Sequence, residues 1–155
     1  MIEQAGWQGI WQIKVVDKLT GKVKHEETLH NRIMNDALDE IIKAMYDSPP
    51  DMQFSHLAIG DSDAPIADTQ TQLGNEVFRA QFVSIERTGV GEVTSLAIIL
   101  DSDYDGAIEE IGIFAGSGAS AAANSGLMIS RILWSYNKLA TEELQMTRID
   151  RIIRA

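Results

Sequence analysis

A strict alternation of apolar and polar residues opens the chain. Trp11, Ile13 and Val15 are separated by single polar residues, which predicts a strand over residues 10–16 with one buried face. A second run rich in β-forming residues, 22–29, follows a short turn-like segment. The two runs together predict an antiparallel hairpin.

The pattern then changes to that of a helix. Apolar residues recur three and four positions apart, with charged residues between them: Ile33, Met34, Ala37, Leu38, Ile41, Ile42 and Met45. This spacing predicts an amphipathic helix of about four turns, with Asn31 as its N-cap and Ser48-Pro49-Pro50 at its end. A helix with one apolar stripe needs a partner, and a sheet is the only large candidate in this chain.

From residue 54 onward the pattern is that of β-strands. Strands are predicted over residues 54–59, 77–87, 92–100, 107–114, 127–134 and 143–153, and the runs 77–87 and 92–100 are expected to pair with each other. In the last run the apolar phase slips from Leu144 and Met146 to Ile149 and Ile153, which predicts a β-bulge. The fold class expected is mainly β, a β-sandwich-like antiparallel sheet with one amphipathic α-helix packed on it.

Two long connections interrupt the predicted strands. Residues 60–76 are polar and rich in turn-forming types, and loops of this length tend to be functional or to form interfaces. Residues 115–126 consist almost entirely of glycine, alanine and serine, a composition typical of flexible loops.

Composition narrows the function classes. A length of 155 residues fits a single domain over 1–155, with residues 1–9 as a possible extended N-terminal arm. The net charge of −10 argues against nucleic acid as a partner, because such a partner requires a basic surface. The chain has no cysteine, no signal-like start and no apolar run of roughly 18 residues, so we expect a soluble, unsecreted protein with no membrane partner.

The most specific chemical motif is an acidic segment, Asp101-Ser102-Asp103-Tyr104-Asp105-Gly106. Carboxylates at alternate positions followed by glycine resemble the first half of an EF-hand calcium loop. The bidentate glutamate expected at the twelfth loop position is replaced by Gly112, and the flanking runs are strands. An acidic β-turn is therefore the favoured interpretation, with a calcium site at Asp101, Asp103 and Asp105 as the alternative and no other cofactor expected.

No catalytic motif stands out. The chain has no Gly-x-Ser-x-Gly elbow, no phosphate-binding loop and no dinucleotide fingerprint. Adjacent acids such as Glu109 and Glu110 point to opposite faces of a strand, so they do not share a substrate. We expect no enzymatic activity. A carbohydrate-binding module, with Trp134 or Tyr136 stacking on a sugar, stays open as an alternative.

Candidate interface residues lie near both ends of the chain. Arg148, Arg151 and Arg154 form a basic set in an otherwise acidic protein, which favours contact with an acidic face of a neighbouring subunit. Trp7 and Trp11 lie close to the chain start, where an arm could grip a partner.

Several short motifs, taken in order, resemble one family. They are Asn31-x-Ile33, Leu57-Ala58-Ile59-Gly60, Thr69-x-x-x-Leu73-x-x-Glu76-Val77-x-Arg79, Ile108-Glu109-Glu110-Ile111-Gly112-Ile113-Phe114 and a late Arg131. This order, over about residues 30 to 135, is similar to small structural proteins of tailed bacteriophages, of the tail fibre, baseplate or minor tail protein type.

The resemblance implies a β-sandwich-like protein that acts in the virion without catalysis. It would be assembled in the host cytoplasm, form homo-oligomers and contact other virion structural proteins of the tail apparatus, whether fibre, baseplate or collar. A capsid decoration or head-fibre anchor protein is one alternative, and a calcium- or carbohydrate-binding module is the other.

Overall fold

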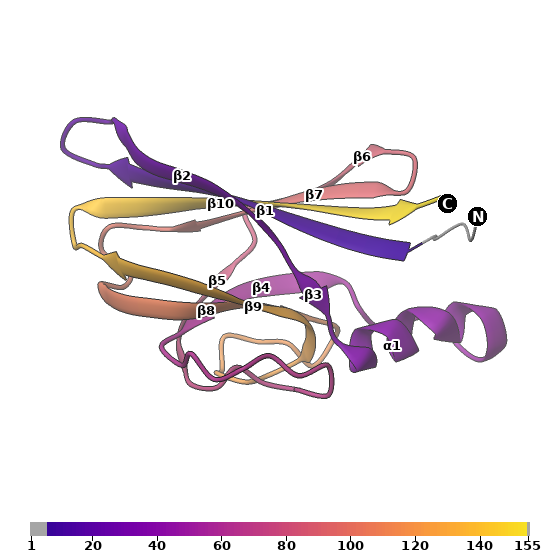
Figure 1. Cartoon of the computed structure of the whole chain (residues 1–155). Coiled ribbons are helices and arrows are strands. Elements are labelled where there is room, and N and C mark those ends of the chain that lie inside the picture. The colour runs from indigo at the N-terminus through magenta and orange to yellow at the C-terminus, as the bar shows by residue number, and fades with distance from the viewer. Residues whose placement is uncertain (1–5, 155) are drawn as a thin grey trace.

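Two antiparallel sheets of five strands each face one another in a computed structural model that describes residues 6–154 (Figure 1). Sheet A has the order β2-β1-β10-β7-β6 and comprises β1 (Gly6–Asp17), β2 (Val23–His30), β6 (Ser84–Gly89), β7 (Glu92–Ile99) and β10 (Glu142–Ile153). Sheet B has the order β3-β9-β8-β4-β5 and comprises β3 (Arg32–Ile33), β4 (Phe54–Gly60), β5 (Glu76–Gln81), β8 (Gly106–Ala115) and β9 (Leu127–Lys138). With the single helix α1 (Asn35–Tyr46), this architecture confirms the predicted fold class.

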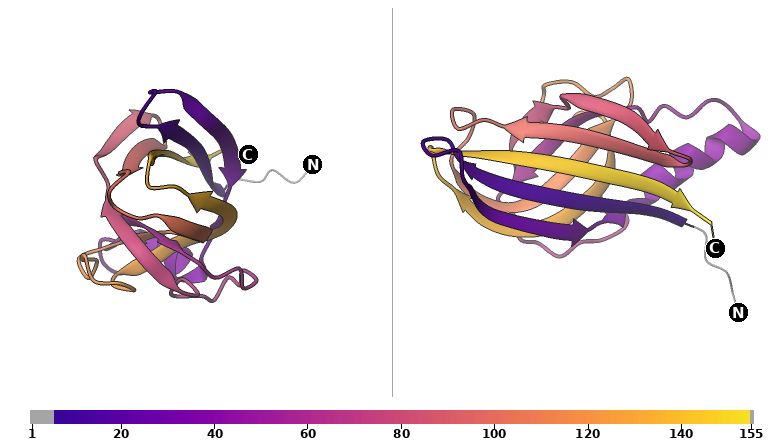
Figure 2. Two further views of the ribbon diagram at one scale, coloured as in Figure 1. Left: turned by 90° about the vertical axis from the view of Figure 1, so that its left-hand side faces the viewer. Right: turned by 90° about the horizontal axis from the view of Figure 1, so that it is seen from above.

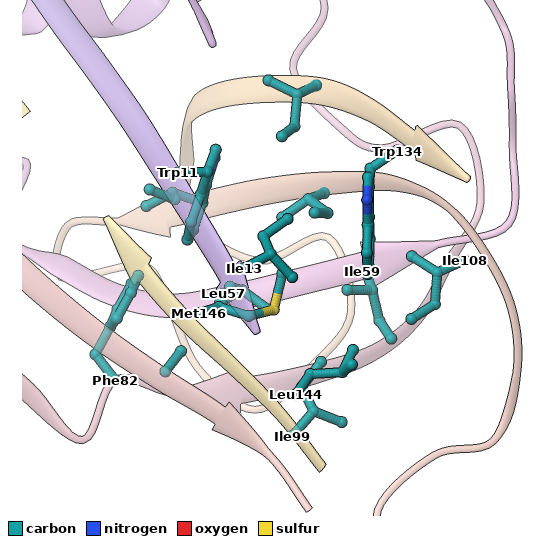
Figure 3. Close-up of a cluster of buried hydrophobic side chains, with 14 of the residues drawn as sticks. Trp11, Ile13, Leu57, Ile59, Phe82, Ile99, Ile108, Trp134, Leu144 and Met146 are labelled. Atoms are coloured by element: carbon teal, nitrogen blue, oxygen red, sulfur yellow. The ribbon is translucent and has the colours of Figure 1, made fainter. Parts of the chain in front are cut away.

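The main apolar core lies between the two sheets, where both contribute alternate side chains (Figure 3). Trp11, Ile13 and Val15 of β1 have no exposed surface, as their alternation with polar residues predicted. β1 pairs with β2 on one side and with β10 on the other. The predicted N-terminal hairpin is therefore present and forms one edge of sheet A.

The bulge predicted in the last strand is absent, and that prediction was wrong. β10 pairs with β1 and with β7 in continuous register. Its inward positions keep their even phase beyond Met146, where Arg148 and Asp150 are both buried. The apparent slip arose because these two inward positions carry an ion pair in place of apolar residues.

The run predicted as one strand over residues 77–87 is two strands in different sheets. β5 pairs with β4 in sheet B, whereas β6 pairs with β7 in sheet A. The chain crosses between the sheets at Phe82, which is buried in the common core, and at Val83. Only the β6 part of the predicted hairpin with β7 is therefore correct.

Helix α1 packs on the sandwich only through its first turns. Met34 is its N-cap, with no side-chain hydrogen bond, so the assignment of Asn31 as the cap was wrong. Ala37 is the one buried helical residue. The rest of the helix extends beyond the sheets, at the end of the molecule where β1 begins and β10 finishes (Figures 1 and 2).

The predicted N-terminal arm is part of the sheet where the structure describes it. Gly6 to Gly9 belong to β1, and Gly6 pairs with Ile153 of β10. The remaining arm residues, 1–5, lie outside the described residues. Within residues 6–154 the one helix is too short and too polar to cross a bilayer.

Candidate protein interaction surface

Several residues of the motifs that suggested a family, including their charged ones, come together on the outer face of sheet B, whereas apolar motif residues such as Leu57 and Ile111 lie in the main core. Glu110 of β8 and Arg131 of β9 form an ion pair of 2.6 Å in which neither side chain has exposed surface. Glu110 also accepts hydrogen bonds from the backbone N–H groups of Gly74 (2.9 Å) and Asn75 (2.8 Å). A buried carboxylate needs such partners, because its desolvation is otherwise uncompensated.

Arg131 also holds the long connection between β4 and β5 against the sheet. Its guanidinium donates to the carbonyl of Ala64 (2.8 Å) and to the side-chain oxygen of Gln70 (3.3 Å). Leu73, in the same connection, is buried against the outer face. A Cβ at Gly112 would lie 2.9 Å from the Leu73 side chain, so the glycine of the β8 motif makes room for the loop. These contacts hold the loop against the outer face of sheet B.

A second arginine fixes the small-residue loop that joins β8 to β9. Arg79 pairs with Glu76 through two hydrogen bonds (2.7 and 2.8 Å) and lies 4.4 Å above the ring of Phe114. The same guanidinium donates to the carbonyls of Ser120 (2.9 Å) and Ser125 (3.1 Å). The composition of this loop predicted flexibility, but it did not predict these hydrogen bonds from Arg79. Both loops lie below sheet B in Figure 1.

Two of the predicted interface residues are buried, and those predictions were wrong. Trp11 is in the core, and Arg148 is fully buried between the sheets. Arg148 pairs with Asp150 (2.7 Å), donates to Ser130 Oγ (2.9 Å) and lies 5.3 Å from the Trp11 ring. Burial lowers the pKa of Arg148, and the nearby Asp150 carboxylate opposes that shift. These side chains join the two sheets and do not face a partner.

Two of the other predicted interface residues, Trp7 and Arg151, line an open apolar groove. It has a volume of about 460 Å³ and lies between α1, the segment before β4 and the end of sheet A. Its apolar lining includes Ile41, Met52, Phe54, Ile85, Val93 and Ile152. Trp7 also lines it, with its indole N–H bonded to Asp150 (2.8 Å), and Arg151 lies at its rim, paired with Glu92 (2.6 Å). Arg154 is exposed at the end of β10.

Helix α1 presents an apolar face that the domain leaves uncovered. Leu38, Ile42 and Met45 are 45%, 42% and 82% exposed, respectively. They lie on one side of the helix because they are four and three residues apart. Only Ile41 of the helix lines the groove, so these three side chains do not fill it. The helix packs on the sheets as predicted, but part of its apolar stripe remains exposed.

The acidic segment 101–105 is a turn between β7 and β8. Asp103 accepts a hydrogen bond from the backbone N–H of Leu100 (2.8 Å), which is ordinary turn chemistry. Burial lowers the pKa of Lys138, while the carboxylates of Glu142, Asp101, Asp105 and Asp103 act in the opposite direction. Within residues 6–154 no three carboxylate or histidine side chains converge as a metal site, so the structure does not bring Asp101, Asp103 and Asp105 together as calcium ligands.

The aromatic residues considered for sugar binding are stacked on each other. The rings of Trp134 and Tyr136 lie 5.2 Å apart at an interplanar angle of 6°. Trp134 is only 5% exposed and donates to Glu27 (2.8 Å). Burial and the hydrogen bond to Glu142 raise the pKa of Tyr136 to about 12. The Trp134 ring therefore has no free face for a sugar.

Comparison with known proteins gives no family or fold relative. No protein-family model, no curated protein and no solved structure matches the chain. The interaction surface is thus defined by geometry alone. Sequence reasoning missed most of its residues, including Met52, Phe54 and Ile85, because they come from separate segments that only the fold brings together.

Proposed function

We propose that this chain is a non-catalytic structural protein of a tailed-bacteriophage virion, located in the tail apparatus. It acts through contacts with copies of itself and with other virion proteins. The observation that carries the proposal is the network on sheet B. Glu76, Arg79, Glu110 and Arg131, which belong to the motifs resembling phage structural proteins, form two buried or nearly buried ion pairs that hold neighbouring loops.

This network supports a scaffold role because it uses the charged residues for internal bonding. Glu110 accepts two backbone N–H groups as well as Arg131, and Arg79 donates to Glu76 and to two serine carbonyls. Groups satisfied in this way are poorly placed for proton transfer to a substrate, which requires a reachable acid or base. The uncovered apolar surface at the α1 end supports assembly with another protein.

The burial of Trp11 favours the tail apparatus over capsid decoration. In the decoration alternative, the N-terminal arm with Trp7 and Trp11 would grip the capsid shell. Trp11 is inside the core, and Trp7 is held against Asp150 in the pocket of its own domain. Neither side chain is on a projecting arm.

Purified particles provide the test. Particles from the strain that encodes the chain are isolated on a density gradient, their proteins are identified by mass spectrometry, and the chain is located with antibody-bound gold in electron micrographs. We expect the chain in particles with gold at the tail; the major capsid protein and an abundant host enzyme are the positive and negative controls. Gold over the head would replace this proposal with the decoration alternative. Absence from particles, or absence of particles, would overturn both.

A further inference from the structure

The uncovered face of α1 and the apolar groove are both sites that another molecule can fill. Leu38, Ile42 and Met45 form a ridge, which we call the helix ridge, and all three are more than 40% exposed. The groove opens between the same helix and the end of sheet A, but its helical wall is Ile41. Ile41 lies beside the ridge on the same side of the helix, but it is the helical residue that lines the groove, so the ridge does not fill the groove within a single copy.

The charges beside these two surfaces are complementary. Asp36 and Asp39 on α1, and Asp47 directly after it, are exposed, and none of them forms an ion pair within the described part of the chain. Near the groove, Arg87 at the rim and Arg154 at the end of β10 are also exposed and, within residues 6–154, form no ion pair. The acidic residues of the helix and the unpaired Arg87 at the groove are opposite in sign, and the ridge and the groove are both apolar.

We propose that the occupant of the groove is the helix ridge of a second copy of this chain. Leu38, Ile42 and Met45 of one copy enter the groove lined by Met52, Phe54 and Ile85 of the next, with Asp39 at the flank of the ridge beside Arg87. This is the helix-in-groove mode of recognition. The inference deepens the proposed function, on which its biological setting rests, by naming the surface through which copies assemble.

The contact joins two different surfaces, the ridge of one copy and the groove of the next. Where the exchange is reciprocal about a two-fold axis, both contacts form within a closed dimer. Where it is not, the contact closes into a ring when its rotation permits and otherwise continues as a filament.

Sedimentation velocity of the pure full chain tests the contact with two variants that each damage one side. Leu38→Asp with Ile42→Asp removes the ridge, and Ile85→Asp, on the edge strand β6, damages the groove. We expect the wild-type chain to associate at concentrations up to about 200 µM and each variant to associate at least about tenfold more weakly. Leu19→Asp is the control, since Leu19 is 82% exposed in the turn between β1 and β2, and it should associate like the wild type.

Mixing the two variants tests the direction of the contact. One intact ridge and one intact groove remain between them, so the mixture should form a one-to-one complex and no larger species. Circular dichroism and thermal melting check that each variant is folded; the milder Met45→Gln replaces the ridge variant, and Ile85→Gln replaces the groove variant, where the original is not folded. A wild-type chain that stays monomeric, variants that assemble like the wild type, or a mixture without the complex would overturn the inference. A monomer that is nevertheless found in tails would leave the proposed function standing.

Discussion

The outer face of sheet B and the α1 end of the molecule are opposites in their surface chemistry. On sheet B, charged residues are buried: Arg131 and Glu110 have no exposed side-chain surface, and loops cover them. At the α1 end, apolar residues are exposed, and Met45 is 82% accessible. The ordinary preference of each residue type for core or surface is reversed in both places.

The difference between the two regions shows which of them has its side chains satisfied by contacts within a single chain. Each buried charge on sheet B has its partners within the same chain, down to the backbone N–H groups of Gly74 and Asn75. The helix ridge has no such partner in the described residues. A region with internally satisfied charges serves stability, whereas an uncovered apolar region indicates association.

The largest effect is expected from breaking the ion pair on sheet B. Arg131→Met leaves the Glu110 carboxylate buried without its cation, and we expect a loss of about 3–5 kcal/mol in the free energy of unfolding. Urea denaturation followed by tryptophan fluorescence measures it. The double variant Arg131→Met with Glu110→Met should be more stable than Arg131→Met alone, because no uncompensated charge remains. If the single variant loses less than the double, the pair does not have the stabilising role described here.

A smaller and more direct comparison uses one leucine from each region. Substitution of Leu73, which is buried on sheet B, by alanine should lower the free energy of unfolding by about 2–5 kcal/mol, because a cavity forms. Substitution of Leu38, which is exposed on α1, by alanine should change the free energy of unfolding of the monomer by no more than about 0.5 kcal/mol. Urea denaturation at low protein concentration measures both. Equal effects would mean either that Leu38 is packed in the monomer or that the loop carrying Leu73 is not packed against sheet B.

The smallest effect concerns pH and sharpens the picture of sheet B. Burial, and then the charge of Arg79, lower the pKa of His56 from its ordinary value of 6.5, with Glu76 acting in the opposite direction. The unfolded chain therefore binds a proton at this site more readily than the folded chain, so His56 reduces stability as the pH falls below about 6.5. His56→Gln should make the melting temperature less dependent on pH between about 7 and 5. An unchanged dependence would contradict this assignment.

The fold was predictable from the sequence wherever residue type and burial agree. Trp11, Ile13 and Val15 alternate with polar residues and are all buried, and the amphipathic segment is α1. The failures occur where burial and residue type disagree. Arg148 and Asp150 occupy inward positions of β10, so a continuous strand was mistaken for one with a bulge, and a buried arginine was mistaken for an interface residue.

Other features depend on contacts between distant segments. The run 77–87 has strand propensity throughout, and nothing in its pattern marks Phe82 as the crossing between two sheets. Likewise, Glu110 and Arg131 are 21 residues apart, and their pairing depends on the register of β8 and β9. The groove combines residues from the helix, the segment before β4 and sheet A. No local pattern encodes such a combination.

The turn at residues 101–105 carries one further consequence. Its carboxylates lie near the ammonium group of Lys138, whose pKa they influence, and that group belongs to the same chain. Many acidic turns recruit a dissolved cation, and their shape then varies with the salt around them. Here a positive charge that acts on the turn belongs to a side chain of the same chain, so it accompanies the turn into every environment that the protein enters.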